Sequence, residues 1–259
     1  MNHMNNRYGT LASWVYDLDK PVGRSFGDVE FYCNRLQKSK GPILEPGVGT
    51  GRILIPLLEA GLAIEGFDAS ENMLNYCRRQ CRARGLDARL QLQRFEDFAY
   101  EQKFEAIIVP VGSFQLITDS VSARAVLQRF HDHLLPNGRL ILDLDPISDF
   151  FSSDVRIRSW QSEDGDVLTL TDNRIETDFV AQTTVSHLRY EHWRDGRLID
   201  TELEFFSLRW WGVIEFELAL HEAGFTNIVI SGDYNHGRPP QKNDQMISFE
   251  ALRSPAQTL

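Results

Sequence analysis

The stretch Ile43-Leu44-Glu45-Pro46-Gly47-Val48-Gly49-Thr50-Gly51-Arg52 carries most of the information in this chain of 259 residues. A short apolar run ends in an acid, and three glycines at two-residue spacing follow it. Glycine has no Cβ and accepts positive φ, so the backbone can turn sharply here and a ligand can approach it closely. The pattern predicts a buried strand, a tight turn and a helix, with a ligand lying on the turn.

The same stretch argues against two phosphate-binding turns. A dinucleotide fingerprint, G-x-G-x-x-G, needs a third glycine where Arg52 stands, and a phosphate-cradling loop needs a Gly-Lys-Ser/Thr that does not follow. Glu45 would also repel a pyrophosphate at the helix N-terminus. An acid at this position suits a cationic ligand, such as the α-amino group of a methionine moiety, and a flat adenosyl group suits the turn.

A second acid follows in register with the first. Residues 62–67 read as a strand after the glycine stop at Gly61, and Asp68 stands at the end of that strand. In a doubly wound sheet, an acid at the carboxyl end of the second strand can accept hydrogen bonds from both ribose hydroxyls. The two acids therefore predict a site for a ligand with a nucleoside at one end and a cation at the other.

Two motifs now carry a family resemblance. Glu45-Pro46-Gly47-Val48-Gly49-Thr50-Gly51 and Gly66-Phe67-Asp68-Ala69-Ser70-Glu71-Asn72-Met73-Leu74 resemble the first two motifs of class I S-adenosylmethionine (SAM)-dependent methyltransferases. The similarity covers about residues 41–145 and 213–231. It is greatest to the small-molecule branch with glycine N-methyltransferases and antibiotic-pathway sugar N,N-dimethyltransferases. It implies methyl transfer from SAM to nitrogen or oxygen of a small-molecule acceptor, with S-adenosylhomocysteine (SAH) as product.

The resemblance also implies a set of cofactor-binding residues. Glu45 would serve the methionine end, Gly47, Gly49 and Gly51 the close backbone approach, and Asp68 the ribose. Arg94 stands where the family often has an acid for the adenine amino group, so that contact passes to Asp97. The other implied residues are Tyr16 and Arg24 for the methionine carboxylate, the latter one residue out of register, with Ala69, Met73, Phe95, Glu96 and Val111.

The rest of the chain predicts an α/β fold with a doubly wound, Rossmann-like seven-stranded sheet. Strands are expected near 42–45, 62–67, 88–93, 104–110, 138–144, 225–230 and 245–252, and helices near 51–60, 70–84, 119–134 and 213–223. Short apolar runs that alternate with helical stretches are typical of parallel strands with helices on both faces. The resemblance implies that the last strand is antiparallel.

We divide the chain into four parts. They are an N-terminal helical cap at 1–40, a SAM-binding core at 41–149, an antiparallel β insertion at 150–211 after the fifth strand, and the remainder of the core sheet at 212–259. In the insertion, residues 166–175, 179–193 and 198–211 alternate apolar and polar side chains, and Asp195-Gly196 is a hairpin signal. The insertion is expected either to cover the acceptor or to pair across a homodimer, because edge strands pair readily.

The insertion also holds the candidates for acceptor chemistry. Tyr190, His192 and His187 are groups that can bind or deprotonate an acceptor, with Tyr190 and His192 on one strand face and His187 on the other. The alternative for each histidine is a packing or surface role. No metal site is expected, because Cys77 and Cys81 at helical spacing have no further ligands near them in the sequence.

Composition limits the partners. The formal net charge is -10 and the basic residues form no block, which argues against a nucleic-acid surface. Three cysteines fit a reducing compartment, so we expect a cytoplasmic protein without a membrane span. Two alternatives to a small-molecule enzyme stay open: a methyltransferase of a protein or RNA target, and a non-catalytic SAM-binding regulatory subunit.

Overall fold

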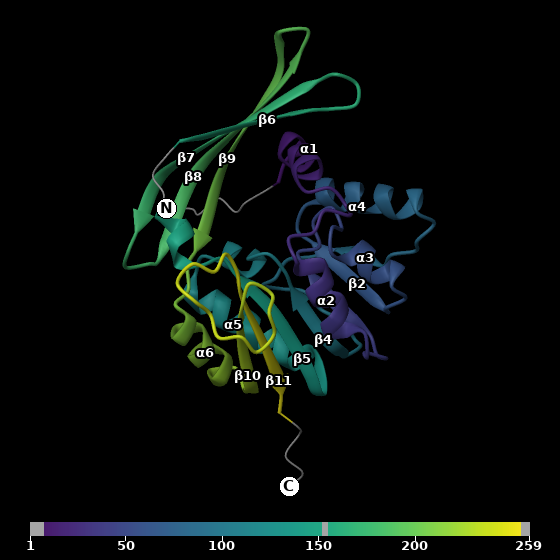
Figure 1. The fold of residues 1–259 in the computed structure, drawn as a ribbon, viewed down its shortest axis with the longest axis vertical. Coiled ribbons are helices and arrows are strands. Elements are labelled where there is room, and N and C mark those ends of the chain that lie inside the picture. The colour runs from purple at the N-terminus through teal and green to yellow at the C-terminus, as the bar shows by residue number, and fades with distance from the viewer. Residues whose placement is uncertain (1–7, 152–154, 255–259) are drawn as a thin grey trace.

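The computed structural model describes residues 8–151 and 155–254, and its largest element is a seven-stranded sheet in the order β10-β11-β5-β4-β1-β2-β3 (Figure 1). The strands are β1 Ile43–Pro46, β2 Ile64–Asp68, β3 Leu90–Leu92, β4 Phe104–Val109, β5 Leu134–Leu144, β10 Phe225–Gly232 and β11 Ile247–Arg253. β1 to β5 pair in parallel, and β11 is antiparallel to both β5 and β10. The predicted Rossmann-like sheet with an antiparallel last strand is confirmed.

Helices cover both faces because successive strand residues point to opposite sides. Ile43, Ala106 and Ile108 belong to one buried cluster, whereas Leu44 and Ile107 belong to another. The first cluster packs against α2 Asp28–Leu36, α3 Leu54–Glu59 and α4 Glu71–Ala83, and the second against α5 Ser120–His133 and α6 Val213–Glu222. The strands are apolar on both sides, as a sheet between two helical layers requires.

A second sheet of four antiparallel strands stands apart from the first (Figure 1). Its strands are β6 Arg156–Gln161, β7 Val167–Asp178, β8 Thr183–Arg194 and β9 Arg197–Arg209. Leu168, Leu170 and Leu188 pack against Leu11 and Val15 of α1, which spans Thr10–Asp19. This confirms the helical segment before the core and the antiparallel insertion after the fifth strand.

Three local features differ from the predicted elements. β6 was not predicted, because it is an edge strand whose positions are almost all exposed and give no alternation of burial. α3 begins at Leu54, after a turn, so that Pro56 lies in the first helical turn, where its missing N–H is not needed. β5 begins at Leu134, directly after α5, rather than at residue 138.

The four-part division of the chain stays a prediction. Residues 1–7 of the cap, 152–154 of the insertion and 255–259 of the last part lie outside the described residues. Within the described ranges, none of the helices has the length and apolar character needed to cross a membrane.

Candidate active site

The cofactor pocket lies at the carboxyl ends of β1, β2 and β3. β1 has β2 on one side and β4 on the other, so the strand order reverses there, and open sheets bind ligands at such a switch point. The pocket has a volume of about 120 Å³. It is lined by Tyr8, Tyr16, Gly47, Gly49, Phe67, Asp68, Ala69, Ser70, Met73, Gln93, Arg94, Phe95, Glu96, Ser113, Leu116 and Ile117.

The glycine turn forms the floor of this pocket. Gly47 has φ +70°, and a Cβ on it would lie 3.2 Å from Cζ of Phe95, so the bare backbone leaves room for a ligand beside the ring. Gly51 has a different role in the structure. A Cβ there would lie 2.6 Å from Sγ of Cys77, so its missing side chain lets α4 pack against the turn, and Gly51 does not line the pocket.

Asp68 is oriented by the backbone. Its Oδ2 accepts a hydrogen bond from the N–H of Gly49 and its Oδ1 one from the N–H of Ser70, each at 2.8 Å. Burial raises the pKa of this carboxyl, and the backbone donors oppose the increase. The carboxylate lines the pocket, so an acceptor position that these backbone donors leave free can meet a ribose hydroxyl.

Glu45 is a buried acid that lacks a partner. Its side chain is 3% exposed, and its Oε2 has no hydrogen-bond donor among the described residues. Burial raises the pKa of this carboxyl well above its usual range, although the charge of Arg52 opposes that effect. An unpaired carboxylate in such a place is costly, so a cationic amino group on a ligand would complete the site.

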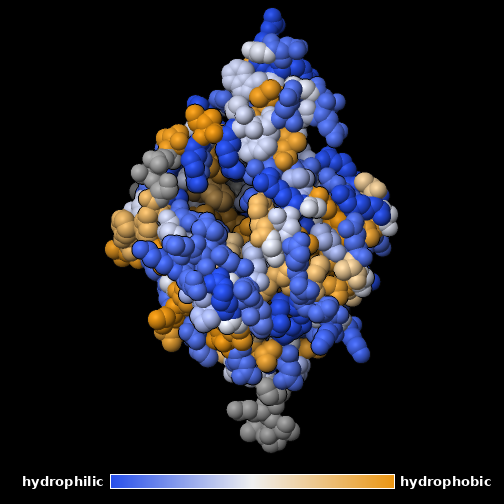
Figure 2. Space-filling view, in the orientation of Figure 1, coloured by the Kyte–Doolittle hydropathy of each residue, from blue (hydrophilic) through white to orange (hydrophobic). Residues whose placement is uncertain are grey.

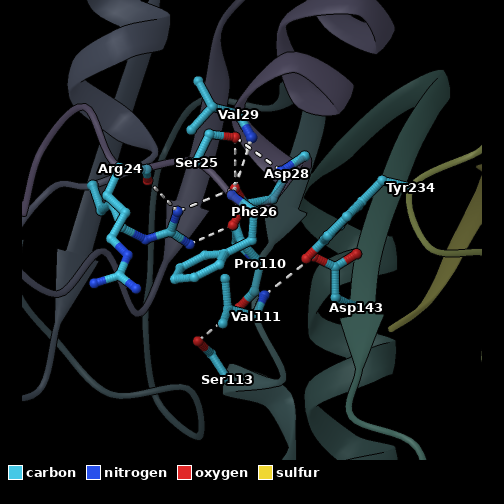
Figure 3. A network of polar contacts seen from close by, with 12 residues as sticks. Arg24, Ser25, Phe26, Asp28, Val29, Pro110, Val111, Ser113, Asp143 and Tyr234 are labelled. Carbon is cyan, nitrogen blue, oxygen red and sulfur yellow. Dashed lines mark hydrogen bonds and ion pairs between the residues drawn. The ribbon is translucent and has the colours of Figure 1, made fainter. Parts of the chain in front are cut away.

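Arg52 does not complete it, because it is paired elsewhere. Its guanidinium forms a buried ion pair with Asp28 and donates a hydrogen bond to the carbonyl oxygen of Arg24 at 3.0 Å. Asp28 also accepts hydrogen bonds from the N–H groups of Phe26 at 3.1 Å and Val29 at 2.9 Å (Figure 3). Arg52 and, to a smaller extent, these two backbone donors hold the pKa of Asp28 below its usual range despite burial.

Comparison with known proteins agrees with this geometry. Residues 43–138 match the family model described as a methyltransferase domain. A glycine/sarcosine N-methyltransferase of Parasynechococcus marenigrum (strain WH8102) is 29% identical over 88% of this chain and 76% of its own length. The CcbJ methyltransferase of Streptomyces caelestis has a similar fold, with a TM-score of 0.77 at 21% identity over 98% of this chain and 100% of that chain.

A further relative is named for a sugar substrate. The dTDP-3-amino-3,6-dideoxy-alpha-D-glucopyranose N,N-dimethyltransferase of Streptomyces fradiae is 28% identical over 52% of this chain, and the aligned region spans about half, 53%, of that relative. Over its core the chain therefore resembles methyltransferases in sequence and in fold.

The groups in and beside the pocket suit SAM. Glu45 does not line the pocket, but it lies two residues before Gly47, which does, and its unpaired oxygen suits the amino group. Asp68 lines the pocket where a ribose can meet it, and Phe95 stands beside the glycine turn. When bound, SAM supplies a methyl group on a positively charged sulfur. The protein's part is to hold and align the reactants.

The structure brings most of the other implied cofactor residues to the pocket. Tyr16, Ala69, Met73 and Glu96 line it, as does Arg94, the residue that departs from the family pattern. Three implied residues lie elsewhere. Asp97 is exposed and is not in the lining, Arg24 donates from Nη1 to the carbonyl oxygen of Asp19 at 2.7 Å, and Val111 lines a neighbouring cavity. The side chain of Arg24 points away from Asp28 (Figure 3).

The neighbouring cavity, which we call the acceptor cavity, has a volume of about 300 Å³. It lies between α1, the end of β5, the inner face of the four-stranded sheet, and the loop from β4 to the 3₁₀ helix η1 Ser113–Leu116. It shares Tyr8, Tyr16, Ser113 and Leu116 with the cofactor pocket. Figure 2 shows the molecule deeply hollowed between the four-stranded sheet and the core.

Of the three candidates for acceptor chemistry, only Tyr190 lines this cavity. His192 shares the inner face with Tyr190 but lies beyond the cavity, with Nε2 3.1 Å from Oδ2 of Asp166 and its ring 5.1 Å from that of Trp14. His187 is on the other face, where its ring lies 4.6 Å from that of Phe205. Both histidines therefore lie where the alternative given in the sequence analysis, a packing or surface role, would place them.

Two residues of the site were missed from the sequence. Tyr8 lines both cavities, with its ring edge-on to Tyr16 at 6.3 Å and to Phe206 at 6.2 Å, and burial raises its pKa. No signal marks it, since it precedes the first helix. Asp145 lines the acceptor cavity, and its place after the fifth predicted strand was a usable signal, because parallel strands end at the same edge as the cofactor site.

Proposed function

We propose that this enzyme transfers a methyl group from SAM to a nitrogen or oxygen of a small molecule held in the acceptor cavity. The observation that carries the proposal is the contact between the two spaces. Tyr8, Tyr16, Ser113 and Leu116 line both, so an acceptor in the cavity lies beside the cofactor pocket. Two relatives are named as methyltransferases of amines on glycine, sarcosine and a sugar, which supports a small acceptor.

The residues have the following proposed roles. Glu45 binds the amino group of SAM, Asp68 accepts hydrogen bonds from the ribose hydroxyls, and the backbone at Gly47 and Gly49 lies against the ligand. Tyr190 and Tyr8, which both line the cavity, hold the acceptor. Displacement at a methyl carbon needs nucleophile, carbon and leaving group in line, so catalysis here is mostly positioning.

Charge weighs against one of the alternatives. The net charge of -10 disfavours a polyanionic substrate such as RNA. We further propose a cytoplasmic enzyme without a nucleic-acid partner, supported by free thiols at Cys77 and Cys81. Pairing of two copies through the insertion is a proposal that sedimentation would test.

Calorimetry with SAM, SAH and NAD tests the cofactor assignment in the full chain. We expect both sulfur compounds to bind and NAD not to bind, because Glu45 opposes a pyrophosphate at the turn. Binding of NAD without any response to SAH would overturn the proposal. SAH binding without SAH production from any acceptor would favour the non-catalytic regulatory subunit.

A further inference from the structure

Asp145 is a carboxylate placed in the acceptor cavity with no part in the cofactor site. Its backbone is fixed by Gln115, whose Oε1 accepts from the N–H of Asp145 at 2.8 Å and whose Nε2 donates to the carbonyl oxygen of Asp145 at 3.3 Å. Gln115 is fully buried. The backbone of Asp145 is therefore held in place while its carboxylate lines the cavity.

The loop after β4 is shaped around this carboxylate. Val111 and Gly112 have φ values of 55° and 67°, and the left-handed region is unfavourable for a β-branched residue such as valine. A Cβ on Gly112 would lie 2.7 Å from Oδ2 of Asp145 and 2.8 Å from Oε1 of Gln115, the side chain that holds the Asp145 backbone. The chain therefore maintains a strained backbone and a bare glycine where the carboxylate and its support need room, and such strain is typical of functional sites.

A buried support holds the strained loop. The N–H of Val111 donates to Oδ2 of Asp143 at 3.1 Å, and the hydroxyl of Tyr234 donates to the same oxygen at 3.1 Å (Figure 3). Asp143 is fully buried in β5, two residues before Asp145. The end of β5 therefore supplies two carboxylates: Asp143, which holds the loop, and Asp145, around which the loop folds.

The charges around the cavity leave Asp145 without an ion pair. Arg156 pairs with Asp172 and Arg158 with Asp19, each at 3.0 Å, and Arg174 donates to the carbonyl oxygen of Phe150. Burial and the nearby charge of Asp149 raise the pKa of Asp145 to about 6, and Lys20 opposes this effect. No salt bridge or side-chain hydrogen bond joins the Asp145 carboxylate to another of the described residues.

We propose that the acceptor is an amine and that Asp145 binds its ammonium form and takes the proton that the reacting nitrogen must lose. The inference rests on the proposed function and names its substrate class. The proton moves from the ammonium nitrogen to Oδ of Asp145. The freed lone pair forms the new bond to the methyl carbon, the carbon–sulfur bond breaks, and its electron pair stays on sulfur. The product is a methylated ammonium ion and SAH, and the proton leaves Asp145 for solvent.

Proton affinity favours an amine over an alcohol. An alkylammonium ion ionises near pH ~10, about 4 units above a carboxyl at pKa ~6, and a hydrogen-bonded pair can share a proton across that difference. A hydroxyl that ionises in the range of water, about 15.7, lies nearly 10 units above it. A partly buried carboxylate also binds an ammonium ion more strongly than a neutral hydroxyl, because the ammonium contact adds the attraction of opposite charges to the hydrogen bond. The same residue would therefore select the substrate and serve its deprotonation.

The first test needs no knowledge of the acceptor. The 13C resonance of the Asp145 carboxyl is titrated in full-length protein saturated with SAH, with Asp145→Asn for assignment, in methylammonium chloride and in sodium chloride of equal ionic strength. We expect a midpoint lower by about half a unit or more in methylammonium, which is about threefold preferential binding to the ionised form. A midpoint in the usual aspartate range, or equal midpoints in both salts, would overturn the inference.

The design separates this inference from the proposed function. If SAH does not bind the wild-type chain, the proposed function fails. If SAH binds and Asp145 ignores methylammonium, only the inference fails. Asp149→Asn is the matched control, because it removes an exposed carboxylate four residues away. It should lower the Asp145 midpoint and preserve the response to methylammonium, and loss of that response in Asp149→Asn would assign the cation site to Asp149 instead.

Turnover gives a second readout. SAH release is measured with paired probes, glucosamine against glucose and glycine against glycolate. For any amine that is turned over, Asp145→Asn should lower kcat/KM by about 100-fold, the usual scale of proton-transfer catalysis, at unchanged SAH affinity. Turnover of an alcohol in preference to its paired amine, or an unchanged rate in Asp145→Asn, would contradict the assignment.

Discussion

The cofactor pocket and the acceptor cavity lie side by side and share four residues, but they are built in different ways. The cofactor pocket uses the turns that follow β1, β2 and β3, where backbone N–H groups orient Asp68 and bare glycines shape the floor. The acceptor cavity uses side chains from α1, the β4–η1 loop, the end of β5 and all four strands β6 to β9. Local backbone geometry forms one space, and long-range packing forms the other.

The largest effect is expected where the cofactor half depends on a buried charge. Arg52→Ala would leave Asp28 unpaired in a site where both side chains are at most 3% exposed, so the free energy of unfolding should fall by about 3 to 5 kcal/mol. Arg78→Ala, which removes an exposed pair with Glu71, should change it by less than about 1 kcal/mol. Urea titrations measure the free energy of unfolding of both variants. Equal losses in the two variants would show that the buried ion pair does not stabilise the cofactor half more than the exposed pair does.

This comparison explains what the sequence could predict. Glu45, the glycine turn and Asp68 could be proposed as site residues because each lies at the end of a strand whose apolar pattern can be read locally. The strand and helix positions of the core followed from the same alternation. α3 and β5 differed only at their starts, where a turn after Gly51 and a direct continuation from α5 decide the boundary.

The acceptor cavity could not be predicted because its walls meet only in the folded chain. Tyr190 was predicted as a candidate. The alternation of apolar and polar residues shows which face of the sheet a side chain is on, but not whether it lies near the cavity along the strand. His192 shares that face and ends beside Asp166, outside the cavity. Tyr8 has no local pattern, and the role of Gly112 depends on a carboxylate more than 30 residues later in the chain.

The second prediction addresses the strained loop of the acceptor half. Gly112→Ala adds a methyl group 2.7 Å from Oδ2 of Asp145 in a left-handed conformation, so the free energy of unfolding should fall by about 2 to 3 kcal/mol. Gly165→Ala is the control, because Gly165 has φ +87° and open space around it, and should cost only about 1 kcal/mol. Urea denaturation curves measure both losses. Equal losses of unfolding free energy in Gly112→Ala and Gly165→Ala would show that the loop is not shaped around Asp145.

A third prediction separates two acids near the cofactor pocket. Asp68→Ala should weaken SAH binding by about tenfold or more, since charge-assisted hydrogen bonds to ribose are lost. Asp97→Ala should change SAH affinity by less than about twofold, because Asp97 is exposed and outside the pocket lining. Calorimetry measures both affinities. A larger loss of SAH affinity in Asp97→Ala would support the adenine contact expected from the sequence and would show that the cofactor does not bind in the pocket described above.

The smallest effect is the dependence of stability on pH in the acceptor half. The pKa of Asp145 is raised to about 6 in the folded chain, so between this value and the usual 3.8 the folded state holds a proton that the unfolded state has released. Stability from this group therefore rises as the pH falls through 6 and levels off below 4. Asp28 and Glu250 act in the opposite direction, because their pKa values are lowered, so the wild-type curve alone mixes both effects.

The comparison with Asp145→Asn isolates this group. The variant cannot take up the proton, so the wild type should gain about 1 kcal/mol relative to Asp145→Asn between pH 7 and pH 4.5, after allowance for the part of the side chain that faces the cavity. Urea unfolding of both proteins at those two pH values measures the difference. Saturating SAH should leave it in place, because Asp145 is not in the cofactor lining. A difference that vanishes with SAH would instead show that the carboxylate senses the cofactor, and the two halves would then be coupled through the end of β5.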